Sequence, residues 1–286
     1  MKRILLSLSA LLVASAVPAL AADLPAKARP MPAPVAVWTW DGFYIGINGG
    51  YSWGRARTTV DYFNTVTGAP IIAPVGSITD GGIDMNGGVF GGQIGYNWQF
   101  SSWLFGLEAD AQWSGQKGGA TFLCSAAGLL PGACFPGSTF LPAGTLGVAL
   151  AVDKKLEWFG TFRGRLGVLA SPSWLLYVTG GLAFGEVQTD ALLTSINPNG
   201  VVVAVAGSSS KTHAGWTIGG GIEGNLGGNW TAKAEYLYMD LGSFDTTVTV
   251  PVALIGANIN SRVTDNIFRV GINYHFSPPA AVVARY

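Results

Sequence analysis

The stretch from residue 90 to residue 113 reads FGGQIGYNWQFSSWLFGLEADAQW and alternates apolar and polar side chains with a period of two. One face of residues 90–100 carries aromatic and aliphatic side chains, and the other carries Gln93, Asn97 and Gln99. Residues 103–113 repeat the pattern, and only Ser101-Ser102 separates the two segments. A period of two is typical of a β-strand, and a two-residue connection is typical of a hairpin. The stretch therefore predicts two antiparallel strands with one apolar and one polar face.

The same alternation recurs along the chain, in residues 41–53, 158–169, 174–186, 215–226, 230–240 and 267–276. These segments have about the 9–11 residues that a tilted strand needs to cross a bilayer. Short connections are expected at 101–102, 171–173 and 227–229, and long loops at 54–88, 114–157, 187–214 and 241–266. Alternating short and long connections are typical of bacterial outer-membrane proteins. We predict an all-β fold, a closed eight-stranded antiparallel up-and-down transmembrane β-barrel with short periplasmic turns and long extracellular loops.

The composition indicates that the apolar face points outward. Only 11% of the 286 residues are charged, whereas soluble domains carry about 25%. A soluble β-sandwich also alternates, but its outward face should carry charges, and here the aromatic face is the uncharged one. The 16 basic residues balance 16 acidic residues, so no positive excess is available to bind nucleic acid.

Aromatic residues gather at both ends of the predicted strands. Beside the short connections lie Trp98, Phe100, Trp103, Trp174 and Trp230. Toward the long loops lie Trp53, Trp113, Phe184, Trp216 and Tyr238. Such positions indicate two aromatic girdles, one at each membrane–water interface.

The N-terminus indicates export. Residues 1–21 combine the basic start Met1-Lys2-Arg3, an apolar run and the small-residue pattern Ala19-Leu20-Ala21, which together predict a cleaved signal peptide. Residues 22–39 are rich in Pro and Ala and are expected to form an extended periplasmic segment. The predicted outer-membrane barrel covers residues 40–276 and a C-terminal tail residues 277–286, so the expected location is the cell outer membrane.

The polar face of the predicted strands carries equal numbers of acids and bases, and in a barrel this face lines the lumen. The inward positions include Glu108, Asp110, Arg163, Arg165, Glu223, Lys233, Glu235 and Arg269. An eight-stranded barrel is only wide enough for side chains to fill it, and unpaired buried charge is costly. We expect these residues to pair into a plug; a proton or ion path is the alternative.

The cysteines and histidines say less about function than the strand pattern does. Cys124 and Cys134 are the only cysteines, and in an exported protein such a pair is expected to form a disulfide. Two histidines at opposite ends of the barrel, His213 and His275, do not make a zinc site. His213 has only the loop serines 208–210 nearby, so we expect no catalytic residue, no metal, no cofactor and no enzyme activity.

Five segments together carry a family resemblance: residues 22–25 (ADLP), 40–46 (WDGFYIG), 163–167 (RGRLG), 177–185 (YVTGGLAFG) and 268–276 (FRVGINYHF). Their order and spacing resemble the small outer-membrane barrel proteins of alphaproteobacteria, the major-surface-antigen group within the OmpA-like porin family. The resemblance implies an eight-stranded barrel, surface exposure, antigenicity and a role in envelope integrity. Some members bind haem, but no binding residue carries over to this chain.

The chain departs from the family in continuing past the aromatic residue of its last strand. The aromatic that the barrel-assembly machinery recognises is therefore open among Tyr274, Phe276 and Tyr286. The partners expected are this machinery, outer-membrane lipid and lipopolysaccharide, while any extracellular ligand stays unidentified. The predicted function is a structural outer-membrane barrel contributing to envelope integrity, and the alternatives are a narrow porin and a surface receptor for haem or another ligand.

Overall fold

A computed structural model of the chain describes residues 38–64, 66–68, 82–125, 134–136, 147–196, 202–250 and 255–276. These residues belong to one compact unit, Val37–Ala280. None of them lies in a helix long and apolar enough to cross a membrane. The predicted signal peptide, nearly all of the Pro/Ala-rich segment and the C-terminal tail lie outside the described residues.

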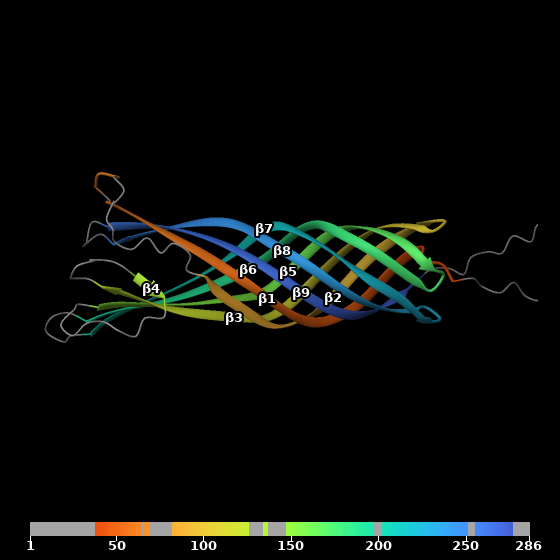
Figure 1. Ribbon diagram of the computed structural model, residues 1–286, viewed down its shortest axis with the longest axis horizontal. Coiled ribbons are helices and arrows are strands. Elements are labelled where there is room, and N and C mark those ends of the chain that lie inside the picture. Colours follow the sequence, from red (N-terminus) through yellow and green to blue (C-terminus); the bar gives the residue numbers. More distant parts are fainter. Residues whose placement is uncertain are drawn as a thin grey trace, which may run out of the picture. The chain divides into compact units, whose positions relative to one another are not determined.

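The described residues form one closed β-sheet (Figure 1). Its strands are β1 (Gly42–Asn64), β2 (Ile83–Phe100), β3 (Trp103–Ser125), β4 (Cys134–Pro136), β5 (Gly147–Ser171), β6 (Trp174–Ile196), β7 (Val202–Gly227), β8 (Trp230–Val250) and β9 (Ile255–His275). Every long strand pairs antiparallel with its neighbours, and β1 pairs with both β2 and β9. The three-residue β4 pairs with β3 at the long-loop end and stands outside the ring. The predicted eight-stranded antiparallel barrel is therefore confirmed.

The three short connections are tight hairpin turns, as predicted. Ser101 in the β2–β3 turn has a φ of 57°, and Gly228 in the β7–β8 turn also has a φ of 57°. Left-handed turn residues match the right-handed twist of the flanking strands, which is why two-residue hairpins favour them. Glycine adopts this conformation without strain at position 228.

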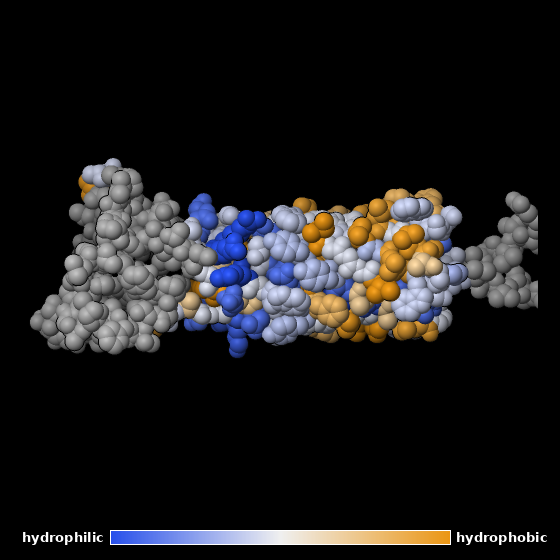
Figure 2. All heavy atoms as spheres, viewed as in Figure 1, coloured by the Kyte–Doolittle hydropathy of each residue, from blue (hydrophilic) through white to orange (hydrophobic). Residues whose placement is uncertain are grey.

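The outward face is apolar and the inward face is polar over the middle of the barrel. Large apolar side chains that point outward include Ile47, Ile94, Phe162, Val178, Ile218 and Val270, all exposed. Figure 2 shows this face as an orange band toward the short turns, followed by paler residues and then a blue hydrophilic belt toward the long-loop end. All ten predicted girdle aromatics point outward or are half-buried.

The strands are longer than the alternation predicted, and the four long loops are correspondingly shorter. β1 continues to Asn64 rather than ending near Trp53, and β3 continues to Ser125 rather than Trp113. Likewise, β5 begins at Gly147 and β7 at Val202. The loop boundaries expected at 54, 114, 157 and 214 were wrong because the lipid-facing signal stops where the strands leave the membrane, while the backbone ladder continues into water.

A β-bulge adds a second reason for the missed boundaries. In β5 the register shifts between Leu156 and Trp158. On the short-turn side of the bulge, Phe159 and Thr161 point inward. On the long-loop side, Leu156 and Lys154 point inward, so the inward positions change from odd to even residue numbers. A bulge inserts one unpaired residue and re-aims the side chains that follow, so a strict period of two cannot be followed through it.

The ring opens beyond the aromatic girdle at the long-loop end. Pairing of β7 with β8 stops at Trp216 and Asp240. Among the described residues, the rest of β7 pairs with β6 alone, and β8 beyond Ser243 pairs with β9 alone. The unpaired strand edges lie beyond the girdle, where water can hydrogen-bond their backbone amide and carbonyl groups.

We predict that a charge on the outward face is tolerated outside the girdles and not between them. Ile47→Arg, on β1 between the two girdles, is expected to destabilise the barrel by about 2–4 kcal/mol, because the cation faces hydrocarbon. Thr59→Arg, on the same strand and outward face but beyond Trp53, is the matched control and should cost little. Urea unfolding in lipid vesicles measures both; equal effects would contradict the placement of the membrane.

Candidate functional site

The inward face at mid-barrel holds a layer of charged side chains, which we call the charged layer. The structure brings together all eight residues that the sequence placed there: Glu108, Asp110, Arg163, Arg165, Glu223, Lys233, Glu235 and Arg269. Each of their side chains has no exposed surface. They come from β3, β5, β7, β8 and β9, because inward positions of these strands reach the same height in the lumen.

Glu108 on β3 is the centre of the charged layer. Its carboxylate forms an ion pair with Arg163, lies 3.1 Å from Lys233 Nζ and lies 3.5 Å from Arg165 Nη1. Arg269 Nη2 is 3.7 Å away, and the Tyr44 hydroxyl donates a hydrogen bond of 2.7 Å to the same carboxylate. One acid on β3 thus meets cations from three other strands.

Asp110 and Glu235 complete the layer on the side toward the long loops. Arg269 bridges them, with Nη2 at 2.8 Å from Asp110 and at 2.7 Å from Glu235. Arg163 contacts the same two carboxylates at 2.9 and 3.1 Å. Each of these guanidinium groups contacts Asp110 and Glu235 in addition to Glu108, an arrangement for which their planar fork of donors is suited.

Glu223 on β7 anchors the side of the layer toward the short turns. Its carboxylate accepts hydrogen bonds from Arg165 Nη2 at 2.7 Å and from Thr231 and Asn273 at 2.6 Å. His275 Nε2 lies 3.6 Å away. Buried charge is stabilised only when it is paired and hydrogen-bonded, and Glu223 has both kinds of partner.

Glycines at inward positions make room for these long side chains. A methyl group at Gly50 would clash with the Phe268 carbonyl oxygen and lie 2.7 Å from Arg269 Cα. One at Gly95 would clash with the ring of Tyr44. The lumen is too narrow for a side chain at every inward position, so large residues face glycines.

Apolar side chains pack in the lumen on the long-loop side of the charged layer, interleaved with the hydrogen-bonded Ser52, Gln116 and Asp265. Thirteen buried residues form this outer apolar layer: Ala56, Ile83, Met85, Val89, Leu156, Phe159, Ala183, Val187, Leu237, Met239, Leu241, Val263 and Ile267. The sequence analysis missed them and treated the inward face as uniformly polar. Their signal was present in β8 and β9, where Leu237, Met239 and Ile267 follow the inward parity of Lys233 and Arg269.

A second apolar cluster closes the end of the lumen near the short turns. Trp40, Leu104, Leu175 and Tyr177 pack there, with Trp38 against them. Trp40 is 1% exposed, and its indole nitrogen donates to the Pro172 carbonyl oxygen at 3.1 Å. The rings of Trp38 and Trp40 contact His275 edge-on, with centroids 5.3 and 5.9 Å apart. The chain just before β1 therefore folds into this mouth of the barrel.

Residues 7–276 match the family described as the outer membrane protein beta-barrel domain. The chain belongs to this family. Its relatives include the 31 kDa outer-membrane immunogenic protein of Brucella melitensis, 34% identical over 278 residues, which are 96% of this chain and 98% of the relative. The 22 kDa outer membrane protein of Rhizobium leguminosarum is 30% identical over 240 residues, covering 83% of this chain and 79% of the relative.

Among solved structures, the outer membrane protein OprG of Pseudomonas aeruginosa aligns with a TM-score of 0.41 at 13% identity, covering 82% of this chain and 97% of that one. The Ail protein of Yersinia pestis aligns with a TM-score of 0.29 at 10% identity, covering 80% and 99%. Likenesses of this size carry no conclusion about function. Family membership and the relatives' names place the chain in the cell outer membrane, as predicted, and confirm the alphaproteobacterial resemblance.

The remaining predictions for this outer-membrane barrel concern the two cysteines, the C-terminal aromatic residues and the serines before His213. The register sets Cys124 opposite Cys134 across β3 and β4, but their side chains lie outside the described residues, so the disulfide stays a prediction. Tyr274 and Phe276 are in ring contact, with centroids 5.0 Å apart, and Tyr286 lies outside the described residues. The serines predicted on a loop before His213 lie instead on β7. The Ser208 hydroxyl donates to Asp190 at 2.6 Å, so this serine is bonded to a carboxylate.

Beyond the outer apolar layer, the lumen of this barrel becomes polar again. Lys154 Nζ donates to the Thr58 and Ser261 hydroxyls at 3.2 and 3.1 Å. These three residues come from β5, β1 and β9 and lie past the outer girdle. Burial lowers the pKa of the Lys154 ammonium to about 8, because the hydroxyl dipoles replace only part of the lost hydration.

We predict that removing one side chain from the charged layer lowers the free energy of unfolding of the barrel. Arg163→Ala leaves Glu108, Asp110 and Glu235 short of a cation in a closed lumen, and Glu108→Ala leaves the cations around it short of an acid. Breaking a buried pair costs about 3–5 kcal/mol. Arg55→Ala removes a surface pair, since Arg55 Nε lies 3.6 Å from Asp84 with both side chains well exposed, and should cost about 1 kcal/mol or less. Urea unfolding separates the cases; equal stability for all three variants would show that the charges are solvated.

We also predict that stability rises with pH between about 8 and 10.5 because of Lys154. The folded-state pKa is lowered, so over this range the unfolded chain binds more protons than the folded one, and raising the pH favours folding. Lys154→Met should flatten this part of the pH profile relative to wild type. Lys155→Met, at the neighbouring outward position, is the control and should leave the slope unchanged; a slope that survives in Lys154→Met would contradict the assignment.

Proposed function

We propose that the chain is a non-enzymatic, structural component of the outer membrane whose lumen is closed to solutes. The observation that carries this proposal is the sequence of layers across the lumen: the Trp40 cluster, the charged layer and the outer apolar layer. Each layer consists of buried side chains, and the charged one balances four acids with four bases. A porin needs a continuous water-filled path, and these layers interrupt it.

The proposed role follows from which surfaces of the barrel remain accessible to other molecules. With the lumen filled, the outward wall and the long-loop end are the parts able to meet other molecules. We propose that outer-membrane lipid and lipopolysaccharide surround the wall and that the barrel contributes to envelope integrity. The relatives' names, outer-membrane immunogenic proteins, support exposure of the loops at the cell surface. A haem or other receptor role would have to reside in those loops.

We further propose that the barrel-assembly machinery recognises the aromatic end of β9. Tyr274 and Phe276 contact each other, and Phe43 on the neighbouring β1 packs against Phe276 with ring centroids 5.5 Å apart. This aromatic group stands at the periplasmic edge of the ring, where the last strand closes against the first.

We predict that the refolded wild-type protein gives no stable open state in planar bilayers. Trp40→Ala combined with Arg163→Ala and Met239→Ala removes a side chain from each of the three layers, and is expected to admit water and raise single-channel conductance. Trp103→Ala, which removes an outward indole at the same end, is the matched control and should stay closed. A wild-type channel of substantial, sustained conductance would overturn the closed-lumen proposal in favour of the narrow porin.

A further inference from the structure

Two pairs of basic side chains face each other across strands on the outward surface. Lys117 on β3 lies directly opposite Lys155 on β5, and Arg57 on β1 lies directly opposite Arg262 on β9. Side chains in such positions are about 5 Å apart at Cβ, and like charges there destabilise a sheet. A chain with few charges nevertheless places two such pairs on its outer wall.

Both pairs stand at one height, just beyond the outer aromatic girdle. Arg57 follows Trp53 by four residues, Lys117 follows Trp113 by four, and Lys155 precedes Trp158 by three. With a rise of about 3.3 Å per residue and a tilt of about 45°, the charges lie about 7–9 Å beyond the tryptophans. The headgroup layer of a bilayer extends about 5–8 Å beyond the hydrocarbon. The hydrophilic belt in Figure 2 lies next to the paler band at the long-loop end.

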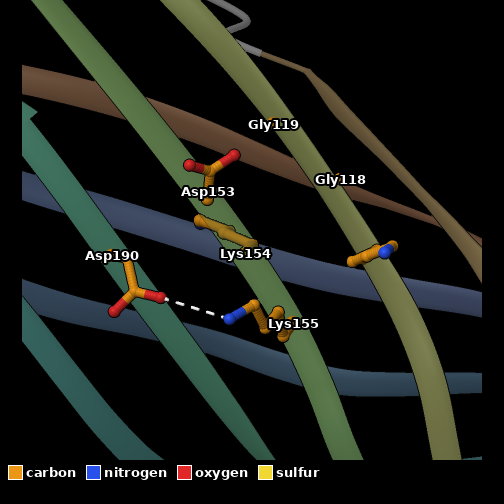
Figure 3. A pocket seen from close by; sticks show the side chains of 7 residues that line it. Gly118, Gly119, Asp153, Lys154, Lys155 and Asp190 are labelled. Atoms are coloured by element: carbon orange, nitrogen blue, oxygen red, sulfur yellow. Dashed lines mark ion pairs between the residues drawn. The ribbon is translucent and has the colours of Figure 1, made fainter.

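Each pair has one cation that is neutralised and one that is not. Lys155 Nζ lies 3.6 Å from Asp190 (Figure 3), and Arg262 forms an ion pair with Asp240. Within the described part of the chain, Lys117 and Arg57 form no ion pair. A positive charge is therefore left at the headgroup level on two sides of the barrel.

The surface beside the lysine pair is hollowed. A depression of about 290 Å³ is lined by Lys117, Gly118, Gly119, Asp153, Lys154, Lys155 and Asp190. Figure 3 shows these glycines on β3 next to the lysine-bearing strand β5. The space over Gly119 is occupied by the Asp153 carboxylate, which a side chain at this position would meet. Three lysines and two aspartates line the hollow, so its lining keeps a net positive charge that favours an anion.

We propose that the Lys117–Lys155 and Arg57–Arg262 pairs bind the phosphate groups of outer-leaflet glycolipid headgroups. A phosphate monoester carries about −1.5 to −2 charges at pH 7, which offsets the repulsion within a pair, and both ammonium and guanidinium groups are phosphate ligands. The inference deepens the proposed lipid contact of the wall and rests on the long-loop end facing outward.

The experiment uses the full mature chain, refolded in detergent and titrated with bisphosphorylated lipid A, with binding followed by native mass spectrometry. Dephosphorylated lipid A tests the phosphate, and millimolar inorganic phosphate tests whether a free ion suffices. We expect tight binding of the phosphorylated lipid alone, weakened by salt. Lys117→Gln and Arg57→Gln are each expected to raise the apparent Kd about fivefold, at roughly one surface charge per variant.

Lys211→Gln, which removes an exposed lysine opposite Val187 on β6, is the matched control and should bind like wild type. Heat-modifiable gel mobility shows that each variant is folded. Equal binding of the dephosphorylated lipid, displacement by inorganic phosphate, or wild-type affinity in both test variants would each overturn the proposal. Conductance of the same preparations reports on lumen closure independently, so a failure of one proposal is distinguishable from a failure of the other.

Discussion

The fold depends on one constraint: a backbone in hydrocarbon has no water to bond, so every amide and carbonyl must find a partner in the sheet. Between the girdles each long strand is paired on both sides, and β1 closes the ring against β9. The ring opens between β7 and β8 only beyond Trp216 and Asp240. The ring is thus closed where lipid surrounds it and open where water can hydrogen-bond the backbone.

Closure with eight strands has a consequence for the inside. The lumen is only wide enough for side chains, so whatever points inward is buried. Acids and bases there must balance, and the contacts of Glu108 with cations from β5, β8 and β9 show how this is achieved. A two-residue slip of one strand would keep its charges inward but separate them from their partners. The charged layer therefore also favours a single register.

If the lumen is closed as we propose, the outside of the barrel is the surface that can meet other molecules. The wall between the girdles is apolar, and the wall just beyond the outer girdle carries opposed cations such as Lys117 and Lys155. The same strands that seal the interior thus display a lipid-facing band and, above it, a polar belt.

How much was predictable differs between the fold and the site. The alternation in residues 90–113 and its repeats determined the strand number, the tight turns, both aromatic girdles and the inward direction of all eight charged-layer residues. These features are local, because a side chain's face follows from its position in its own strand. The strand ends were misplaced because outside the membrane the outward face no longer has to be apolar, and the bulge near Glu157 reverses the parity.

The sequence by itself thus determined which residues point into the barrel. Only the tertiary structure decided which of them meet: that Arg269 bridges Asp110 and Glu235, and that Trp40 reaches across to Pro172. The stagger between strands sets these heights, and it depends on the tilt and closure of the whole ring. A single segment of sequence does not contain this information. The outer apolar layer and the Trp40 cluster could therefore be identified only from the tertiary structure.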